Sequence, residues 1–225
     1  MSGFDDLSSA YQSVLCKDVR WFGESPDYFA YYKARYVYDH LGPGFKGSIL
    51  DYGCGIGSVT KWLNRLFDHT GADVLGYDVS VRSIEQACKN NKGIDFTHDK
   101  SYVESRIFNA VILANVLHHV AKGDRVLFLK DTIGRLNKDG VIIIFEHNPY
   151  NPLTQAVVRS SVIDKGAVLV SSKDMNNLLR LAGIRVTGMK YILFFPHFLR
   201  FLRPLESKLS NLPIGAQYVF TGQAI

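Results

Sequence analysis

The chain has 225 residues, of which 47% are hydrophobic and 21% are charged, and its net charge is +5. This length and composition suit one well-buried globular domain. No apolar run approaches the ~20 residues of a membrane-spanning helix, and the acidic, polar first residues carry no secretory signal. The odd cysteine count (Cys16, Cys54, Cys88) predicts reduced thiols and a cytoplasmic location. The modest positive charge has no clustered basic stripe, so we expect no nucleic-acid partner.

Strands and helices alternate through residues 45–150. Buried strands are expected at residues 48–53, 72–78, 93–99, 108–117 and 141–147, and helices at 59–67, 81–90 and 124–136. Residues 137–140, Asn-Lys-Asp-Gly, break the last helix. The apolar run at residues 108–117 is typical of the middle of a parallel sheet that is covered on both faces. This alternation predicts an α/β fold with a doubly wound parallel sheet.

The two ends of the chain are organised differently from its middle. Residues 4–40 are rich in Tyr and Phe and read as helical, with a stop at residues 42–44, Gly-Pro-Gly. After Pro149 the alternation loosens into a helix at residues 173–183 and two late strands. We expect one domain over residues 1–225, comprising a helical cap (1–44), a core (45–150) and a substrate-side segment with the last two strands (151–225).

The loop after the first strand contains three glycines at alternate positions, Gly53, Gly55 and Gly57. Ligands of open α/β sheets bind at the carboxyl ends of strands, where bare backbone can approach them closely. A dinucleotide fingerprint, G-x-G-x-x-G, fails here because its third glycine position is Ser58. Asp51, next to this loop, would face a pyrophosphate unfavourably but suits a cationic group. The loop therefore predicts a ligand with a positive charge.

Two further acids follow the next strands. Asp78 ends the second strand, about twenty residues after the last glycine, where a carboxylate suits both hydroxyls of a ribose. Asp99, after the third strand, is placed to meet the edge of an adenine. An amino-acid group, a ribose and an adenine in that order describe S-adenosylmethionine.

These motifs resemble those of the class I S-adenosylmethionine-dependent methyltransferases. The residues ILDYGCGIG are similar to the family's first motif, GYDVS to the second, THD to the adenine contact and FNAVILANVLHHV to the fourth motif. The resemblance covers residues 45–150 and implies a mostly parallel seven-stranded sheet of order 3-2-1-4-5-7-6, with helices on both faces and an N-terminal helical cap. Asn109 and residues 137–140 depart from the usual pattern without touching the chemistry.

The cofactor residues predicted from these motifs lie in the glycine loop, at strand ends and in the cap. They are Asp51, Gly53, Cys54, Gly55, Gly57, Asp78, Val79, Asp99, Asn115, Tyr11, Tyr28 and Lys33. Tyr11, Tyr28 and Lys33 are expected to close over the cofactor, and Lys33 to pair with the methionine carboxylate.

A base must take the proton of a hydroxyl acceptor. His118, His119, Glu146 and His147 follow strands four and five, which are neighbours in the implied sheet. We predict His119 as the base, with Glu146 as a second candidate or as its orienter, and His118 as a further catalytic residue. The same four groups could bind a divalent metal, as in some quinone and catechol methyltransferases, but we predict no metal.

The predicted function is methyl transfer to a small-molecule, glycan or lipid-linked acceptor, with O-methylation favoured. Adenine methylation is rejected because Asn148-Pro149-Tyr150 follows strand five rather than strand four. A cofactor-binding adaptor without chemistry stays open, as does a dehydrogenase. Residues 191–209 mix apolar and basic side chains and read as a connector packed on the sheet. The alternative is a helix at a membrane surface. The oligomeric state is not predicted.

Overall fold

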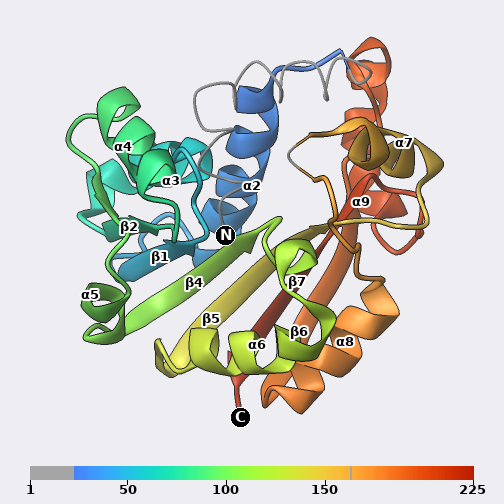
Figure 1. Cartoon of the computed structure of the whole chain (residues 1–225). Helices are drawn as coiled ribbons and strands as arrows, with labels where there is room; N and C mark the ends of the chain where they lie inside the picture. The colour runs from blue at the N-terminus through green and yellow to red at the C-terminus, as the bar shows by residue number, and fades with distance from the viewer. Residues whose placement is uncertain (1–22, 163) are drawn as a thin grey trace.

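A central sheet with helices on both faces organises the computed structural model, which describes residues 23–162 and 164–225 (Figure 1). Its strand order is β3-β2-β1-β4-β5-β7-β6. β7 pairs antiparallel with both β5 and β6, and the other pairs are parallel. The predicted fold class and strand order are confirmed. The strands are β1 (Ser48–Tyr52), β2 (Asp73–Tyr77), β3 (Asp95–Thr97), β4 (Phe108–Ala114), β5 (Leu136–His147), β6 (Ile184–Ile192) and β7 (Gln217–Ala224).

The helices fill the connections between these strands. They are α2 (Pro26–Leu41), α3 (Ser58–Phe67), α4 (Val81–Asn90), α5 (Lys100–Glu104), α6 (Arg125–Ile133), α7 (Pro152–Ser160), α8 (Ser172–Leu181) and α9 (Glu206–Leu209). α2 begins after Ser25, whose hydroxyl accepts a hydrogen bond from the backbone N–H of Tyr28 and caps the helix. The predicted helix from residue 4 lies outside the described residues up to residue 22.

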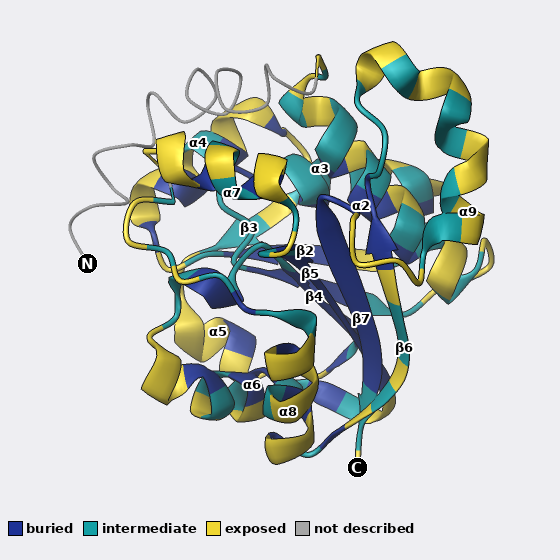
Figure 2. Ribbon diagram, turned by 90° about the vertical axis from the view of Figure 1, so that its right-hand side faces the viewer, coloured by how far each residue is buried: buried dark blue, intermediate teal, exposed yellow. Residues whose placement is uncertain are grey.

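The sheet has a hydrophobic core on each face. Figure 2 shows its buried strands lying between two layers of helices. Alternate residues of β5 serve opposite faces: Ile142 and Ile144 pack in one cluster with α5, α6 and α8, and Ile143 and Phe145 in the other with α2 and α3. This period of two follows from strand geometry. It matters for function because the next two residues of β5, Glu146 and His147, continue the same alternation.

Two helices and one loop differ from prediction. α5 and α7 were not predicted, although Asn151 followed by Pro152 is a helix-start signal: the Asn151 side chain accepts from two backbone N–H groups of α7. The break predicted at residues 137–140 is wrong, since α6 ends earlier and these residues belong to β5. They form a bulge, because Phe108 of β4 pairs with Leu136 while Ala110 pairs with Val141.

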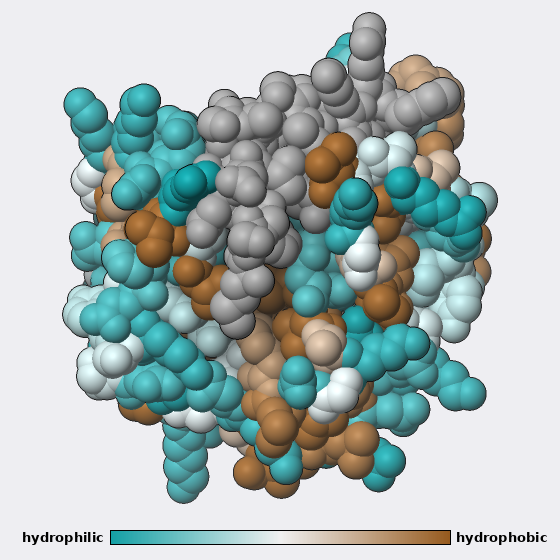
Figure 3. All heavy atoms as spheres, viewed as in Figure 1, coloured by the Kyte–Doolittle hydropathy of each residue, from teal (hydrophilic) through white to brown (hydrophobic). Residues whose placement is uncertain are grey.

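The segment 191–209 connects β6 to β7, as predicted, but most of it does not pack on the sheet. After β6 the chain forms a kinked 3₁₀ helix over His197–Leu205 in which no residue is buried. Phe198 and Phe201 are 73% and 71% exposed. None of the helices in the described part of the chain combines the length and apolarity that crossing a bilayer demands. Hydrophobic side chains also reach the surface at the lower edge of the face in Figure 3, below the central grey atoms.

One aromatic ring explains two glycines, Gly57 before α3 and Gly76 in β2. A Cβ on Gly57 would lie 2.6 Å from the Phe96 ring of β3, and a Cβ on Gly76 would lie 2.5 Å from the same ring. Gly57 also has φ = +77°, a conformation that L side chains rarely adopt. Gly57 is therefore needed for the turn into α3 and for the seat of Phe96.

Replacing Gly57 with Ala should destabilise the fold by about 2–4 kcal/mol, because left-handed backbone strain adds to overpacking against Phe96. The matched control is Gly93→Ala, which has φ = +83° but nothing within 4 Å of its Cβ. That control should lose only about 1–2 kcal/mol of strain. Urea unfolding measures both variants, and equal losses would show that the Phe96 contact contributes nothing.

Candidate functional site

A pocket of about 550 Å³ runs along the carboxyl ends of four neighbouring strands, β2, β1, β4 and β5. Asp78 lies at its β2 end, Asp51 and the glycine loop lie at β1, Asn115 follows β4 and His147 ends β5. The carboxyl ends of a doubly wound sheet are where ligands bind, and the volume is in the range of ligand pockets.

The loop after β1 lines the pocket with Gly53, Cys54 and Gly55. The backbone N–H groups of Gly53 and Cys54 donate to the carbonyl of Tyr77 at 2.7 and 2.9 Å, which ties the loop to the end of β2. Burial raises the pKa of the Cys54 thiol well above its ordinary value, so this thiol is not reactive. Gly57 is not among the lining residues, and its role is the packing described above.

Asp51 is completely buried at the pocket wall. Its Oδ2 accepts from the Thr60 hydroxyl at 2.6 Å, and its Oδ1 has no hydrogen-bond partner among the described residues. Burial raises the pKa of Asp51 to about 6, against the Thr60 hydrogen bond and the charge of Lys33, which lower it. A buried carboxylate oxygen without a partner is costly, so this atom suits a cationic ligand group.

Lys33 of α2 is a buried basic residue in the same pocket as Asp51. It is 7% exposed, lines the pocket and makes no ion pair among the described residues. Burial lowers the pKa of Lys33 to about 8, opposed by the charges of Glu146, Asp51 and Asp164. The pocket thus holds one buried acid and one buried base, as a zwitterionic amino-acid group requires.

Asp78 and Val79 line the β2 end of the pocket. The Asp78 carboxylate accepts from the backbone N–H of Gly55 at 2.8 Å and of Ser80 at 2.9 Å, so it also holds the glycine loop in place. Asp99 is exposed, caps α5 by accepting from the Ser101 N–H, and is not among the lining residues. The structure therefore brings Asp78 to the pocket and not Asp99.

One face of α2 covers the pocket. Its lining residues are Pro26, Phe29, Ala30 and Lys33, at the i, i+3, i+4, i+7 spacing of one helical face. Tyr28 is not among them, and the guanidinium of Arg203 lies 4.4 Å from the centre of its ring. Phe29 was not predicted to line the pocket. Its position four residues before Lys33, on the same face of a helix, could have indicated it. Tyr11 lies outside the described residues.

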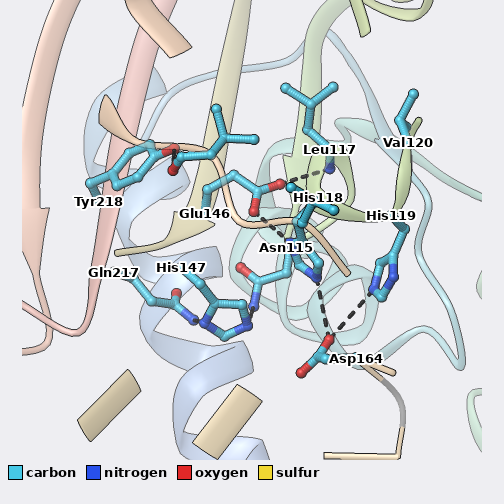
Figure 4. Close-up of polar contacts among 12 residues, drawn as sticks. Asn115, Leu117, His118, His119, Val120, Glu146, His147, Asp164, Gln217 and Tyr218 are labelled. Atoms are coloured by element: carbon cyan, nitrogen blue, oxygen red, sulfur yellow. Dashed lines mark hydrogen bonds and ion pairs between the residues drawn. The ribbon is translucent and has the colours of Figure 1, made fainter. Parts of the chain in front are cut away.

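Glu146 and His118 form a buried pair where β5 meets the turn after β4 (Figure 4). Glu146 Oε2 contacts His118 Nδ1 at 2.6 Å, and Oε1 accepts from the backbone N–H of Leu117 at 2.7 Å. Burial alone would lower the pKa of His118, but Glu146 and Asp164 outweigh it and raise the pKa to about 9. The pair is thus an imidazolium and a carboxylate at neutral pH, and neither residue lines the pocket.

His119, His147 and Asp164 line the pocket beside that pair. His119 Nε2 lies 3.6 Å from Asp164 Oδ1, and the ring of His147 lies against the side-chain amides of Asn115 and Gln217. Burial and the His118 charge lower the pKa of both His119 and His147 to about 4, so both rings are neutral at pH 7. A pocket-lining neutral imidazole can accept a proton.

Asp164 lines the pocket and was not predicted from the sequence. It lies between α7 and α8, and its Oδ1 contacts His118 Nε2 at 3.3 Å as well as His119. Burial would raise the pKa of Asp164, but the His118 hydrogen bond and nearby charges lower it to about 2. No periodicity or motif marks this residue. Glu146, predicted to orient His119, contacts His118 instead.

The geometry can now be compared with known proteins. A family model described as a methyltransferase domain matches residues 28–188, which is most of the chain. The chain belongs to the class I S-adenosylmethionine-dependent methyltransferase family. S-adenosylmethionine is therefore the cofactor expected of this methyltransferase chain, as predicted.

Solved structures share the fold at low sequence identity. A SAM-dependent methyltransferase from Archaeoglobus fulgidus has a TM-score of 0.66 and 16% identity, covering 88% of this chain and 94% of its own. A TehB-like SAM-dependent methyltransferase from Corynebacterium glutamicum has a TM-score of 0.63 and 18% identity, covering 97% and 98%. The plantazolicin methyltransferase BpumL in complex with SAH has a TM-score of 0.64 and 15% identity, covering 99% of both chains. A search of curated protein sequences finds no match.

The buried acid Asp51 should cost this methyltransferase stability when no ligand is bound. Because its folded pKa lies about two units above the ordinary value of 3.8, ionised Asp51 destabilises the fold, fully above about pH 6 and not at all below about pH 4. Asp51→Asn should therefore raise the Tm by several degrees at pH 7.5, equivalent to roughly 2–3 kcal/mol at most. The gain should shrink at pH 4.5.

Thermal unfolding without cofactor measures the effect, and exposed Asp95→Asn is the control. The charged and polar groups that act on Asp51 are Lys33 of α2, Thr60 of α3 and Asp78 after β2. Since none of them changes in the variant, a lower Tm for Asp51→Asn at pH 7.5 would contradict the prediction.

Proposed function

We propose that the protein transfers the methyl group of S-adenosylmethionine to a hydroxyl of a small-molecule, glycan or lipid-linked acceptor. The observation that carries this proposal is the composition of the pocket. Groups suited to a ribose, an amino-acid moiety and a proton transfer follow one another along β2, β1, β4 and β5.

The residues of the pocket fit the cofactor. Asp51, with its unpartnered Oδ1, would hold the ammonium group, and Lys33 the carboxylate of the methionine part. Asp78 would hold the ribose hydroxyls, and Gly53 and Gly55 leave bare backbone beside the ligand. When bound, the cofactor supplies an electrophilic methyl group on a sulfonium.

The other end of the pocket supplies the proton acceptor. His119 lines it with Asp164 behind its Nε2 at 3.6 Å, so a proton taken from an acceptor hydroxyl is stabilised by that carboxylate. Bound S-adenosylmethionine would supply its methyl carbon to the deprotonated acceptor oxygen, and its sulfur would keep the electron pair of the broken carbon–sulfur bond, leaving S-adenosylhomocysteine. The Glu146–His118 pair positions Asp164 and thereby His119.

Among the acceptor classes, the exposed aromatics of the 197–205 segment support a lipid-linked one. Phe198 and Phe201 lie near Arg200, a combination that suits contact with an anionic lipid surface. We keep small molecules and glycans beside it, because the pocket's size fits all three.

An adaptor that binds the cofactor without chemistry is the second candidate. It shares Asp51, Lys33 and Asp78 with the enzyme and needs none of the groups at the β5 end. Cofactor binding without turnover on any acceptor would favour it.

Asp51→Asn should weaken S-adenosylmethionine binding at least tenfold, because the neutral amide loses its charge-assisted bond to the ammonium group. Isothermal titration measures this loss, with Asp95→Asn as the control of unchanged affinity. Unchanged affinity in Asp51→Asn would show that Asp51 does not bind the ammonium group, and would contradict the proposed orientation of the ligand.

His119→Ala should lower turnover at least a hundredfold and leave S-adenosylhomocysteine affinity within about twofold, because it removes a base and no cofactor contact. Formation of S-adenosylhomocysteine is followed with a panel of phenols, sugars and polyprenyl-linked sugars. His98→Ala, an exposed histidine, is the matched control. Retained turnover in His119→Ala would exclude His119 as the base.

A further inference from the structure

The side chains of His118, His147 and Asp164 form a cluster of possible metal ligands. Each side chain offers one ligand atom, and the three atoms lie within 4.8 Å of one another. Two imidazoles and a carboxylate form a donor set that first-row transition metals prefer. We propose that this cluster binds a divalent transition-metal ion, and that an acceptor oxygen completes its coordination.

Three separate elements bring the ligands together. His118 follows β4, His147 ends the neighbouring strand β5, and Asp164 lies on the connection from α7 to α8. Backbone contacts hold that connection against the histidine turn: the N–H of Val168 donates to the carbonyl of His118 at 3.0 Å. Arg125 holds the same loop by donating to the Val168 carbonyl. The cluster is therefore preorganised rather than a chance meeting of surface groups.

A supporting layer orients the first histidine. Glu146 binds Nδ1 of His118, which leaves Nε2 facing Asp164, and Leu117 fixes the other oxygen of Glu146. A carboxylate that binds the distal nitrogen of a histidine is the usual support of a metal-ligating imidazole. Together, Glu146 and Asp164 supply two negative charges for a divalent ion. The ion would replace the Nε2 proton of the His118 imidazolium, and that proton would be released to solvent.

The second histidine has two side-chain amides beside it. Asn115 Nδ2 lies 3.1 Å from Nε2 of His147, and Gln217 Nε2 lies 3.5 Å from Nδ1. The oxygens of both amides are buried and have no hydrogen-bond partner among the described residues. If both amides turn, the Gln217 oxygen accepts the Nδ1 proton and Asn115 Nδ2 no longer donates to Nε2, which is then free to be the ligand. Asn115 Oδ1 is then an oxygen available to the ion or to its bound water.

The geometry needs only a small contraction to close around an ion. Metal–ligand bonds of about 2.1 Å in a tetrahedral site put ligand atoms about 3.4 Å apart. Side-chain rotations that move the ligand atoms by about 1 Å therefore suffice. The Nε2–Oδ1 distance of 3.3 Å between His118 and Asp164 already has this value. Three protein ligands leave a coordination position open, as in catalytic rather than structural sites.

The ion would act on the acceptor. His147 and Asp164 line the pocket, so the open position faces the acceptor end, beside His119. A hydroxyl bound to a divalent ion loses its proton more readily, and His119 would receive that proton. Only this role rests on the proposed function, because binding of the ion is independent of methyl transfer.

Metal binding is tested on the full chain after chelator treatment. Isothermal titration with Zn²⁺ and Mn²⁺, and the visible spectrum with Co²⁺, should show one equivalent bound, and Mg²⁺ should bind far more weakly. Asp164→Asn, a change of similar shape, should lose at least tenfold in affinity, as should His147→Ala. His98→Ala should bind like the wild type. Circular dichroism establishes that each variant is folded.

The outcomes separate this inference from the proposed function. Equal metal affinity in the wild type and Asp164→Asn, or no stoichiometric binding at all, overturns the metal site. Turnover by chelator-treated, metal-free protein at the full rate also overturns the ion's role and leaves methyl transfer intact. One equivalent of bound metal with cofactor binding but no turnover on any acceptor overturns the proposed function and leaves the metal site standing.

Discussion

The hydrogen bond between Glu146 and His118 is the contact on which the acceptor end of the pocket depends. It joins the end of β5 to the turn after β4, and it is completely buried. Removing one partner of a buried ionic pair typically costs about 3–5 kcal/mol, because the other charge stays behind without compensation. The pair fixes the His118 ring, which in turn meets Asp164 of a distant loop. Through these contacts the sheet positions Glu146 of β5, His118 after β4, and Asp164 between α7 and α8.

Strand alternation decides which residue of β5 works in the pocket. Even-numbered residues of β5 pack against α6 and α8, odd-numbered ones against α2 and α3. Glu146 therefore ends in the interior with His118, whereas His147 faces the pocket. Two adjacent polar residues thus have different surroundings, since Glu146 contacts His118 and His147 lines the pocket. Adjacent His118 and His119 are also separated, since on the 3₁₀ helix Leu117–His119 the first is buried and the second lines the pocket.

The sequence predicted the fold well because the fold follows from local patterns, and the same patterns place several of the residues that line the pocket. Apolar runs alternating with helical periodicity determine a parallel sheet, and acids or glycines placed after a strand must lie at its carboxyl edge; Asp51, Gly53 and Asp78 are examples. Asp164 could not be predicted, since a loop without periodicity carries it 46 residues from His118 in sequence. Asp99 and Tyr28 do not line the pocket, because Asp99 caps α5 and the ring of Tyr28 lies beside the Arg203 guanidinium.

The unbound pocket retains charges that a hydrophobic core would not tolerate. Asp51 and Lys33 are both buried. Burial raises the pKa of Asp51 and lowers the pKa of Lys33, which favours the neutral form of each group. Two such groups destabilise an empty pocket, but a zwitterion that meets both offsets the cost of burying them. A ligand that binds only the folded protein would therefore raise its stability. The two ends of the pocket are electrostatically coupled, because the charges of Glu146 and Asp164 at the acceptor end oppose the lowering of the Lys33 pKa by burial.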